Sequence, residues 1–225
     1  MKRLILPLLL ISLCCLNLNC LVNSYYCSAR TLKPAESAIT FGLDNIVSSD
    51  FGDVTLEFNP HLGYNIGLPL RLETGLHFVY LPHALLEWQL RWQVNPRRFK
   101  HFDFSIDAQL GTFGFEYFYA KYGCVISKQI KKVAPYIHYF HLSRIYHKES
   151  DSGDDIDEAI DEAIKDFYNK TDIIGTGIEW RAQRFLSVVP QIQGIFINNF
   201  DYAMLMVSIG VRFHIPRREK DEEDI

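Results

Sequence analysis

Hydrophobic and polar residues alternate along the last long segment of the chain, residues 202–213. Successive side chains of an extended strand point to opposite faces, so this segment would have one apolar face and one mixed face. The apolar face would carry Ala203, Leu205, Val207, Ile209, Val211 and Phe213. A tilted strand needs about 9–11 residues to cross a bilayer, and this segment is long enough. A barrel spans lipid only when no strand edge is left unpaired, so earlier segments should repeat the pattern.

The same alternation recurs in nine earlier segments. They cover residues 39–44, 54–66, 72–80, 84–94, 102–110, 115–126, 133–146, 173–183 and 186–199. Most of them exceed the roughly five or six residues that are typical of strands in soluble proteins. Bacterial single-chain barrels have an even number of antiparallel strands. We therefore predict an all-β fold, a transmembrane-type antiparallel up-and-down β-barrel of about ten strands, over residues 36–215.

The connections between these segments fall into two sets if the first strand begins and the last strand ends on the periplasmic side. Turns at 67–69, 96–101, 128–132 and 183–185 would face the periplasm, and connections at 48–52, 82, 111–114, 148–172 and 198–201 would face outward. The long connection, 148–172, thus lies outside, where such barrels carry long loops. It is rich in Asp and Glu, and apolar residues within 155–168 have helical spacing, which predicts a short amphipathic helix. The charged tail, 216–225, is predicted to be disordered.

Residues 1–26 have the pattern of a secretory signal peptide. Lys2 and Arg3 precede an apolar run, 4–16, which is shorter than the roughly twenty residues of a spanning helix. Residues 27–35 would then be a linker to the barrel. Cys20 and Cys27 follow the apolar run, so either is a candidate for lipidation, although neither follows the Gly, Ala or Ser that lipoprotein signals usually place there. A plain cleaved signal is the alternative.

The ten residues from Cys27 read Cys-Ser-Ala-Arg-Thr-Leu-Lys-Pro-Ala-Glu. This segment resembles the start of the mature chain in a set of uncharacterised bacterial outer-membrane barrel proteins and lipoproteins. The resemblance implies a location in the outer membrane.

Composition excludes some classes of function. The chain has 225 residues and a formal net charge of −4, so it offers no large basic surface for nucleic acid. The 16 Phe and 12 Tyr suit a barrel with aromatic girdles at both membrane interfaces. There is no Gly-rich phosphate loop, no zinc-spaced set of Cys and His and no cofactor fingerprint. We expect no cofactor and no metal, and the expected partner is outer-membrane lipid.

Charged residues gather on the face opposite the apolar band. Those expected to form a lumen charge network are Glu57, Glu73, Glu87, Arg91, Asp103, Asp107, Lys121, Glu179, Arg181 and Arg212, with Asp44 and His77 on the same face. Buried charges persist when they are paired and hydrogen-bonded, so the network would plug the lumen. The alternative is a narrow polar path or a small ligand pocket, since general porins have about sixteen strands or more.

A candidate catalytic pair lies in the segment 133–146. His141 and Ser143 are two residues apart and share one face, within about 7 Å along a strand. A Ser activated by a His is the minimum for acyl transfer, and a carboxylate that orients the His would complete it. This His-x-Ser motif is similar to that of outer-membrane lipid A deacylases, which implies a site near the outer rim. Those enzymes follow the Ser with Asn, whereas this chain has Arg144; Glu116 is the nearest acid at the same rim.

The sequence therefore favours an outer-membrane barrel with a structural or surface-interaction role. The alternative is a membrane-lipid acyl hydrolase that uses Ser143 and His141. A third hypothesis is a secreted soluble barrel that binds a lipophilic ligand in an apolar interior, which would require the apolar faces to point inward.

Overall fold

The computed structural model describes residues 26–50, 53–79, 85–94, 102–113, 117–147, 171–197 and 202–216. Within these ranges it gives the backbone alone for residues 46–50, 53–58, 113, 117, 144, 146–147 and 202–203. The expected acidic loop with its helix and the charged tail lie almost entirely outside the described residues. Among the described residues, no helix is long and apolar enough to cross a membrane.

The described chain forms ten strands in the places where the alternation predicts them. Their bounds are β1 Ser37–Asp50, β2 Asp53–Leu68, β3 Leu72–Val79, β4 Leu85–Gln93, β5 Asp103–Phe113, β6 Tyr117–Ser127, β7 Val133–His147, β8 Thr171–Gln183, β9 Leu186–Ile197 and β10 Tyr202–Ile215. A short 3₁₀ turn, η2 (Pro69–Arg71), joins β2 to β3. The prediction of ten strands is therefore confirmed.

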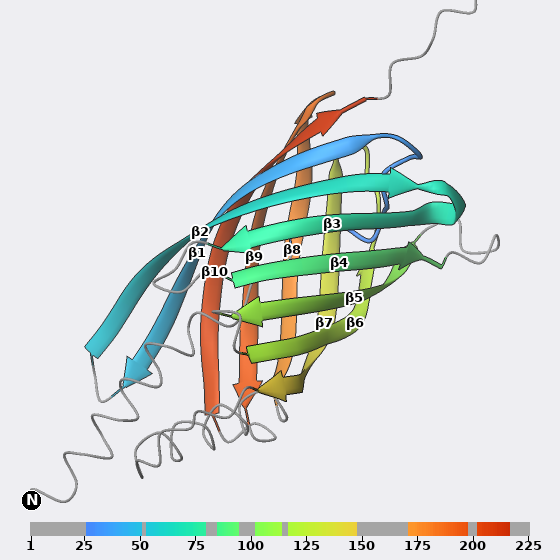
Figure 1. Cartoon of the computed structure of the whole chain (residues 1–225). Helices are drawn as coiled ribbons and strands as arrows, with labels where there is room; N and C mark the ends of the chain where they lie inside the picture. Colours follow the sequence, from blue (N-terminus) through green and yellow to red (C-terminus); the bar gives the residue numbers. More distant parts are fainter. Residues whose placement is uncertain are drawn as a thin grey trace, which may run out of the picture.

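Each strand pairs antiparallel with the next, and β10 pairs with β1 to close the barrel. Figure 1 shows the tilted strands wrapped in sequence order, with β1 lying between β2 and β10. Ser37 at the start of β1 is opposite Ile66 on one side and Ile215 on the other. The fold is thus a closed antiparallel up-and-down β-barrel, as predicted.

The two ends of this barrel differ. We name the turn end the one at which β1 starts, β10 stops, and β2–β3, β4–β5, β6–β7 and β8–β9 are connected. The opposite end, at which residues 148–170 connect β7 to β8, is the loop end.

Apolar side chains point outward around the barrel. Exposed large apolar residues on the wall include Phe41, Leu62, Leu76, Trp88, Ile106, Leu110, Tyr122, Ile178, Ile192, Leu205 and Ile209. Their neighbours in sequence point inward and are buried, many of them polar, such as Thr40, Asn65, Gln89, Gln109, Gln191 and Ser208. This is the arrangement of a lipid-spanning barrel with a polar interior. It is the reverse of what the soluble, ligand-binding barrel requires.

Two strands are longer than their sequence patterns predict. β1 covers 14 residues and continues past the predicted stretch 39–44. Gly111 was predicted to begin a tight turn but lies inside β5, opposite Glu87 on β4 and Tyr119 on β6. A side chain at Gly111 would run into the Tyr119 ring, which lies over it inside the barrel. Gly111 is therefore explained by packing in the lumen and not by a turn.

Candidate functional site

The residues before β1 occupy the lumen. Residues 26–36, the N-terminal segment, were predicted to end a signal and form a linker, but Tyr26, Cys27, Ser28, Ala29 and Leu32 are buried. The segment has no periodic pattern from which its position in the lumen could be predicted. It is held instead by hydrogen bonds between its own backbone and side chains of the barrel interior.

These hydrogen bonds reach several strands at the turn end. The backbone N–H of Ser28 donates to Glu179 Oε2 at 3.1 Å, and the Ser28 hydroxyl donates to the same oxygen at 2.8 Å. The N–H of Ala29 donates to Ser127 Oγ at 3.1 Å, and that of Leu32 donates to Glu73 Oε2 at 2.8 Å. Thr31 donates to Gln93 from both its backbone and its hydroxyl, and Arg30 pairs with Asp103 at 3.3 Å. Residues of β3, β4, β5, β6 and β8 thus fix the segment.

Tyr26 marks the deepest described point of this segment. Its hydroxyl donates a hydrogen bond to Asp44, and its ring stacks on His61 with the ring centroids 5.1 Å apart. A side chain at Gly42 or Gly210 would run into that ring. Two glycines on adjacent strands, β1 and β10, therefore make the space in which Tyr26 lies.

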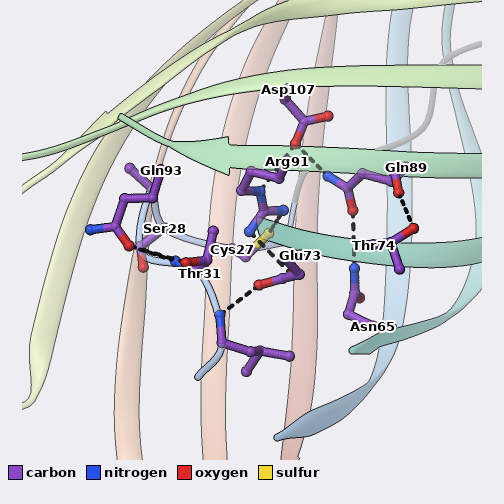
Figure 2. A network of polar contacts seen from close by, with 12 residues as sticks. Cys27, Ser28, Thr31, Asn65, Glu73, Thr74, Gln89, Arg91, Gln93 and Asp107 are labelled. Atoms are coloured by element: carbon purple, nitrogen blue, oxygen red, sulfur yellow. Dashed lines mark hydrogen bonds and ion pairs between the residues drawn. The ribbon is translucent and has the colours of Figure 1, made fainter. Parts of the chain in front are cut away.

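Arg91 is the centre of the lumen charge network. Figure 2 shows its guanidinium between Asp107, Glu73 and Cys27, which come from β5, β3 and the N-terminal segment. Its Nε lies 3.1 Å from Asp107 Oδ2, and its Nη1 lies 3.4 Å from Glu73 Oε1. Glu73 also pairs with Arg212 of β10 at 3.0 Å. These ion pairs join both sides of the lumen, and the side chains of Arg91, Glu73 and Asp107 have no exposed surface.

A second group of charges lies further toward the loop end. Lys121 Nζ lies 3.1 Å from Glu87 Oε1, and the hydroxyl of Tyr119 donates to the same carboxylate oxygen at 2.6 Å. Between the two groups, His77 Nε2 and Gln89 Oε1 are 2.8 Å apart, and His77 Nδ1 is 3.1 Å from Nε2 of His61. Hydrogen bonds therefore join polar side chains of the interior at several levels between the turn end and the loop end.

Most residues predicted to line the lumen do so. Glu73, Glu87, Arg91, Asp103, Asp107, Lys121, Glu179 and Arg212 are all buried. Arg181 is paired with the buried Ser187 on β9, but it is exposed at the turn end of β8 and does not belong to the buried network. The side chain of Glu57 lies outside the described part of the chain.

Cys27 lies deep in this interior. Its Sγ accepts a hydrogen bond from Arg91 Nη2 at 2.6 Å. Burial raises the pKa of the Cys27 thiol, although Arg91 and Arg212 nearby act in the opposite direction. The other predicted lipidation candidate, Cys20, lies outside the described residues.

The predicted pair on β7 lies on the outer wall. His138, Phe140 and Leu142 are buried inside the barrel, so the alternate residues His141 and Ser143 face outward. The structure adds an acid that the sequence analysis did not identify. His141 Nδ1 lies 2.9 Å from Oδ1 of Asp172, its pairing partner on β8.

Asp172 has a second partner on the same wall. The hydroxyl of Tyr139 donates to Asp172 Oδ1 at 2.8 Å. We name the four residues Tyr139, His141, Ser143 and Asp172 the outer-wall cluster. The side chains of His141 and Asp172 are only 28% and 24% exposed. A carboxylate on a lipid-facing wall is costly, and ionisable residues in such places commonly mark functional sites.

Asp172 escaped the sequence analysis because it stands at the end of the acidic loop. Its signal is the period of β8, since Asp172, Ile174, Thr176 and Ile178 share the outward face. An acid on an otherwise apolar face would have stood out. Glu116, the acid considered from sequence, lies outside the described residues, as does the side chain of Arg144.

The described residues hold no cluster of three or more His, Cys, Asp or Glu side chains suited to a metal ion. The lumen and the outer-wall cluster are thus the two candidate functional sites. The first offers ion pairs that hold the N-terminal segment, and the second offers a Ser, a His and an acid at the lipid surface.

Comparisons with known proteins find barrels of the same general kind. The porin NanC has 8% identity and a TM-score of 0.43, over 79% of this chain and 98% of that one. The N-terminal barrel of OprF from Pseudomonas aeruginosa has 9% identity and a TM-score of 0.37, over 82% and 100%. Ail of Yersinia pestis, in complex with a heparin analogue, has 11% identity and a TM-score of 0.35, over 81% and 99%. No protein-family model and no curated protein matches the chain. The likeness concerns the barrel architecture of bacterial outer-membrane proteins, so function must be argued from this chain's own residues.

Proposed function

We propose that this chain is a bacterial outer-membrane protein with a closed lumen, which acts structurally or through its surface and not as a pore. The exposed apolar wall supports insertion in a membrane, because a closed barrel leaves no unpaired strand edge in lipid. The turn end, at which β1 starts and β10 stops, would face the periplasm, and the loop end with the acidic loop would face outward. Outer-membrane lipid is then the partner of the wall.

The observation that carries the closed lumen is the set of contacts around Arg91. This residue joins Glu73, Asp107 and Cys27, so strands and N-terminal segment are tied together in the barrel interior. Water and ions cannot pass through close-packed, paired groups without breaking these contacts.

Two measurements test this proposal. Fractionation followed by a heat-shift gel should place the protein in the outer membrane and show different migration before and after boiling. The purified full chain in a planar bilayer should give no discrete conductance steps under conditions where a general porin gives them. Recovery in the soluble periplasm, or reproducible conductance steps, would overturn it.

For the N-terminus, we propose that a signal peptide is removed before Tyr26 and that Cys27 keeps a free thiol. A diacylglyceryl group on Cys27 would have to fit beside Arg91 in the packed interior, and lipid is disfavoured there. If the chain is a lipoprotein, Cys20 is the residue that carries the lipid. Intact mass of the purified protein distinguishes these cases, and a mature chain with lipid on Cys27 would contradict the proposal.

A second candidate function is favoured by the hydrogen bond between His141 and Asp172. In an outer-membrane lipid acyl hydrolase, Asp172 would hold His141 with its Nε2 free to accept a proton. Ser143 Oγ would attack the ester carbonyl of a lipid and pass its proton to His141, which would give that proton to the departing lipid alcohol as the ester bond breaks and the acyl-enzyme forms. Water, activated by His141, would then hydrolyse the acyl-enzyme and release the fatty acid and free Ser143. The hydrogen bond between Ser143 and His141 would form when substrate binds, since catalytic hydrogen bonds are often long in free enzymes.

This candidate has a direct test. The variant Ser143→Ala should abolish release of fatty acid from envelope lipid, and Asp172→Asn should reduce it by about 10⁴-fold, as removal of an orienting acid does elsewhere. Both variants should keep the heat shift of the folded barrel. If the folded Ser143→Ala variant released fatty acid at an unchanged rate, the hydrolase would be ruled out and the structural or surface role would remain.

A further inference from the structure

Three turns at the turn end of the barrel repeat one combination of side chains. Each places an exposed large apolar residue beside a cation in sequence: Leu70 with Arg71, Ile130 with Lys131, and Phe185 with Arg184. Leu70, Ile130 and Phe185 are 82%, 51% and 52% exposed. We name these six residues the turn collar. Because they belong to the β2–β3, β6–β7 and β8–β9 connections, they are spread around the barrel rim.

Two of these turns contain residues with positive φ, at which large side chains are unusual. Leu70, Arg71 and Lys131 have φ values of 61°, 62° and 54°, a left-handed conformation that Gly or Asn adopts most readily. A non-glycine residue there carries strain. The turn geometry therefore does not explain why these positions hold a large apolar or cationic side chain.

The charge at this end is one-sided. Lys33, Lys128, Lys132 and Arg181 are exposed there in addition to the cations of the turn collar. Among the described residues of this end, Asp103 is paired with Arg30, and Glu36, half-buried, accepts a hydrogen bond from the backbone of Lys33. The described part of the rim thus presents more exposed cations than exposed carboxylates, and it suits an anionic surface.

Aromatic residues mark the level of this rim. Trp92 and Trp180 are exposed near the turn ends of β4 and β8, and Lys128 Nζ lies 5.3 Å from the centre of the Phe102 ring. Amphipathic aromatic rings favour the boundary between acyl chains and headgroups. Trp92 is paired with Leu72, which follows Arg71, and Trp180 lies four residues before Arg184, so the turn collar would lie at the depth of lipid phosphates.

We propose that the turn collar binds the headgroups of an anionic phospholipid leaflet, with Leu70, Ile130 and Phe185 at the acyl boundary and Arg71, Lys131 and Arg184 on the phosphates. A cation held at this depth gains from negative surface potential, while an apolar neighbour anchors it against the lipid. This binding rests on the proposed membrane location of the barrel, but not on the state of the lumen or on the outer-wall cluster.

Tryptophan fluorescence tests this directly. The full chain with Trp88→Phe keeps Trp92 and Trp180, both near the turn collar, and is refolded into bilayers that mix phosphatidylcholine with phosphatidylglycerol. Brominated phosphatidylglycerol should quench these residues with at least about threefold higher relative affinity than brominated phosphatidylcholine. Sodium chloride at about 0.5 M should weaken this preference, because exposed charges are screened.

The variants separate charge from fold. Replacing Arg71, Lys131 and Arg184 together by Gln should bring the lipid preference to about one, whereas Arg71→Lys with Arg184→Lys should retain it. Both variants should keep the heat shift. Equal quenching by the two lipids in the parent protein, an unchanged preference in the triple Gln variant, or loss of the preference on adding inorganic phosphate at constant ionic strength would overturn the proposal; the last would point to a site for free phosphate.

Discussion

Nη2 of Arg91 donates a hydrogen bond to Sγ of Cys27 at 2.6 Å, which ties the segment before the first strand to the middle of the lumen. The sulfur is thereby enclosed by charged groups of β3, β4 and β5. A cysteine that sequence reasoning considered for lipidation thus has a structural environment of its own, and that environment controls its reactivity.

Cys27 should react slowly with iodoacetamide in the folded protein. The thiolate is the reacting form, and burial raises the pKa of Cys27, so its labelling should increase only at pH values above those at which an ordinary thiol titrates. Peptide mapping by mass spectrometry after timed labelling measures this. Unfolding in urea should restore an ordinary rate, and rapid labelling of the folded protein at neutral pH would contradict the burial of this thiol.

Replacing Arg91 by Met should strongly destabilise the barrel. The change leaves Asp107 without its cation and Glu73 with Arg212 alone, and loss of one partner in a buried network costs about 3–5 kcal/mol. Urea unfolding of the detergent-refolded protein gives the difference. Arg181→Met is the matched control, because Arg181 is exposed and surface changes cost about 0.5 kcal/mol or less. Equal effects of the two substitutions would show that Arg91 does not hold the lumen together.

Lys121 and Glu87 should behave as a pair. Lys121→Met alone removes the cation from a buried carboxylate that keeps only the Tyr119 hydroxyl among the contacts described above, so it should destabilise. Adding Glu87→Gln removes that uncompensated charge and should recover part of the loss. A double-mutant cycle of unfolding free energies should give a coupling of about 0.5–3 kcal/mol, and additive effects would argue against the ion pair.

Gly42→Leu should displace Tyr26. A side chain at this position of β1 runs into the ring of Tyr26, so the contacts of that ring with Asp44 and His61 are lost. Trypsin cleavage after Arg30, followed by mass spectrometry, should become about fivefold faster as the N-terminal segment loosens. Ala108→Leu, which adds a similar side chain to the outer wall, serves as control. No change in cleavage would mean that Tyr26 does not fix the segment.

The barrel could be predicted because the alternation of side chains determines both strands and faces. Leu205 and Ile209 are exposed, and Met206 and Ser208 are buried, as the period of two requires. The two faces of 133–146 are harder to tell apart in the sequence, so the outward direction of His141 and Ser143 follows from the structure. The period determines the face of a strand residue but not its distance from the mouth of the barrel, so it could not show that Arg181, which pairs with the buried Ser187, is exposed.

Contacts between residues that are distant in the sequence could not be predicted. The pairing of His141 with Asp172 depends on the register of β7 against β8, and the two residues are 31 positions apart in the sequence. The N-terminal segment was missed for a different physical reason. It has neither a strand nor a helix of its own, and its position follows from side chains such as Glu73 and Glu179, which are distant in the sequence.

The pairing of β1 with β10 also constrains the order of folding. The seam between β1 and β10 joins residues as far apart as Ser37 and Ile215, so it can form only when both ends of the barrel sequence are present at the site of folding. Such long-range pairing is slow, and until it is complete two strand edges stay open to other chains. The N-terminal segment lies inside the finished wall, so we expect it to dock while the seam is still open. Its hydrogen bonds to five strands would then hold these strands around the segment while the sheet closes into a barrel.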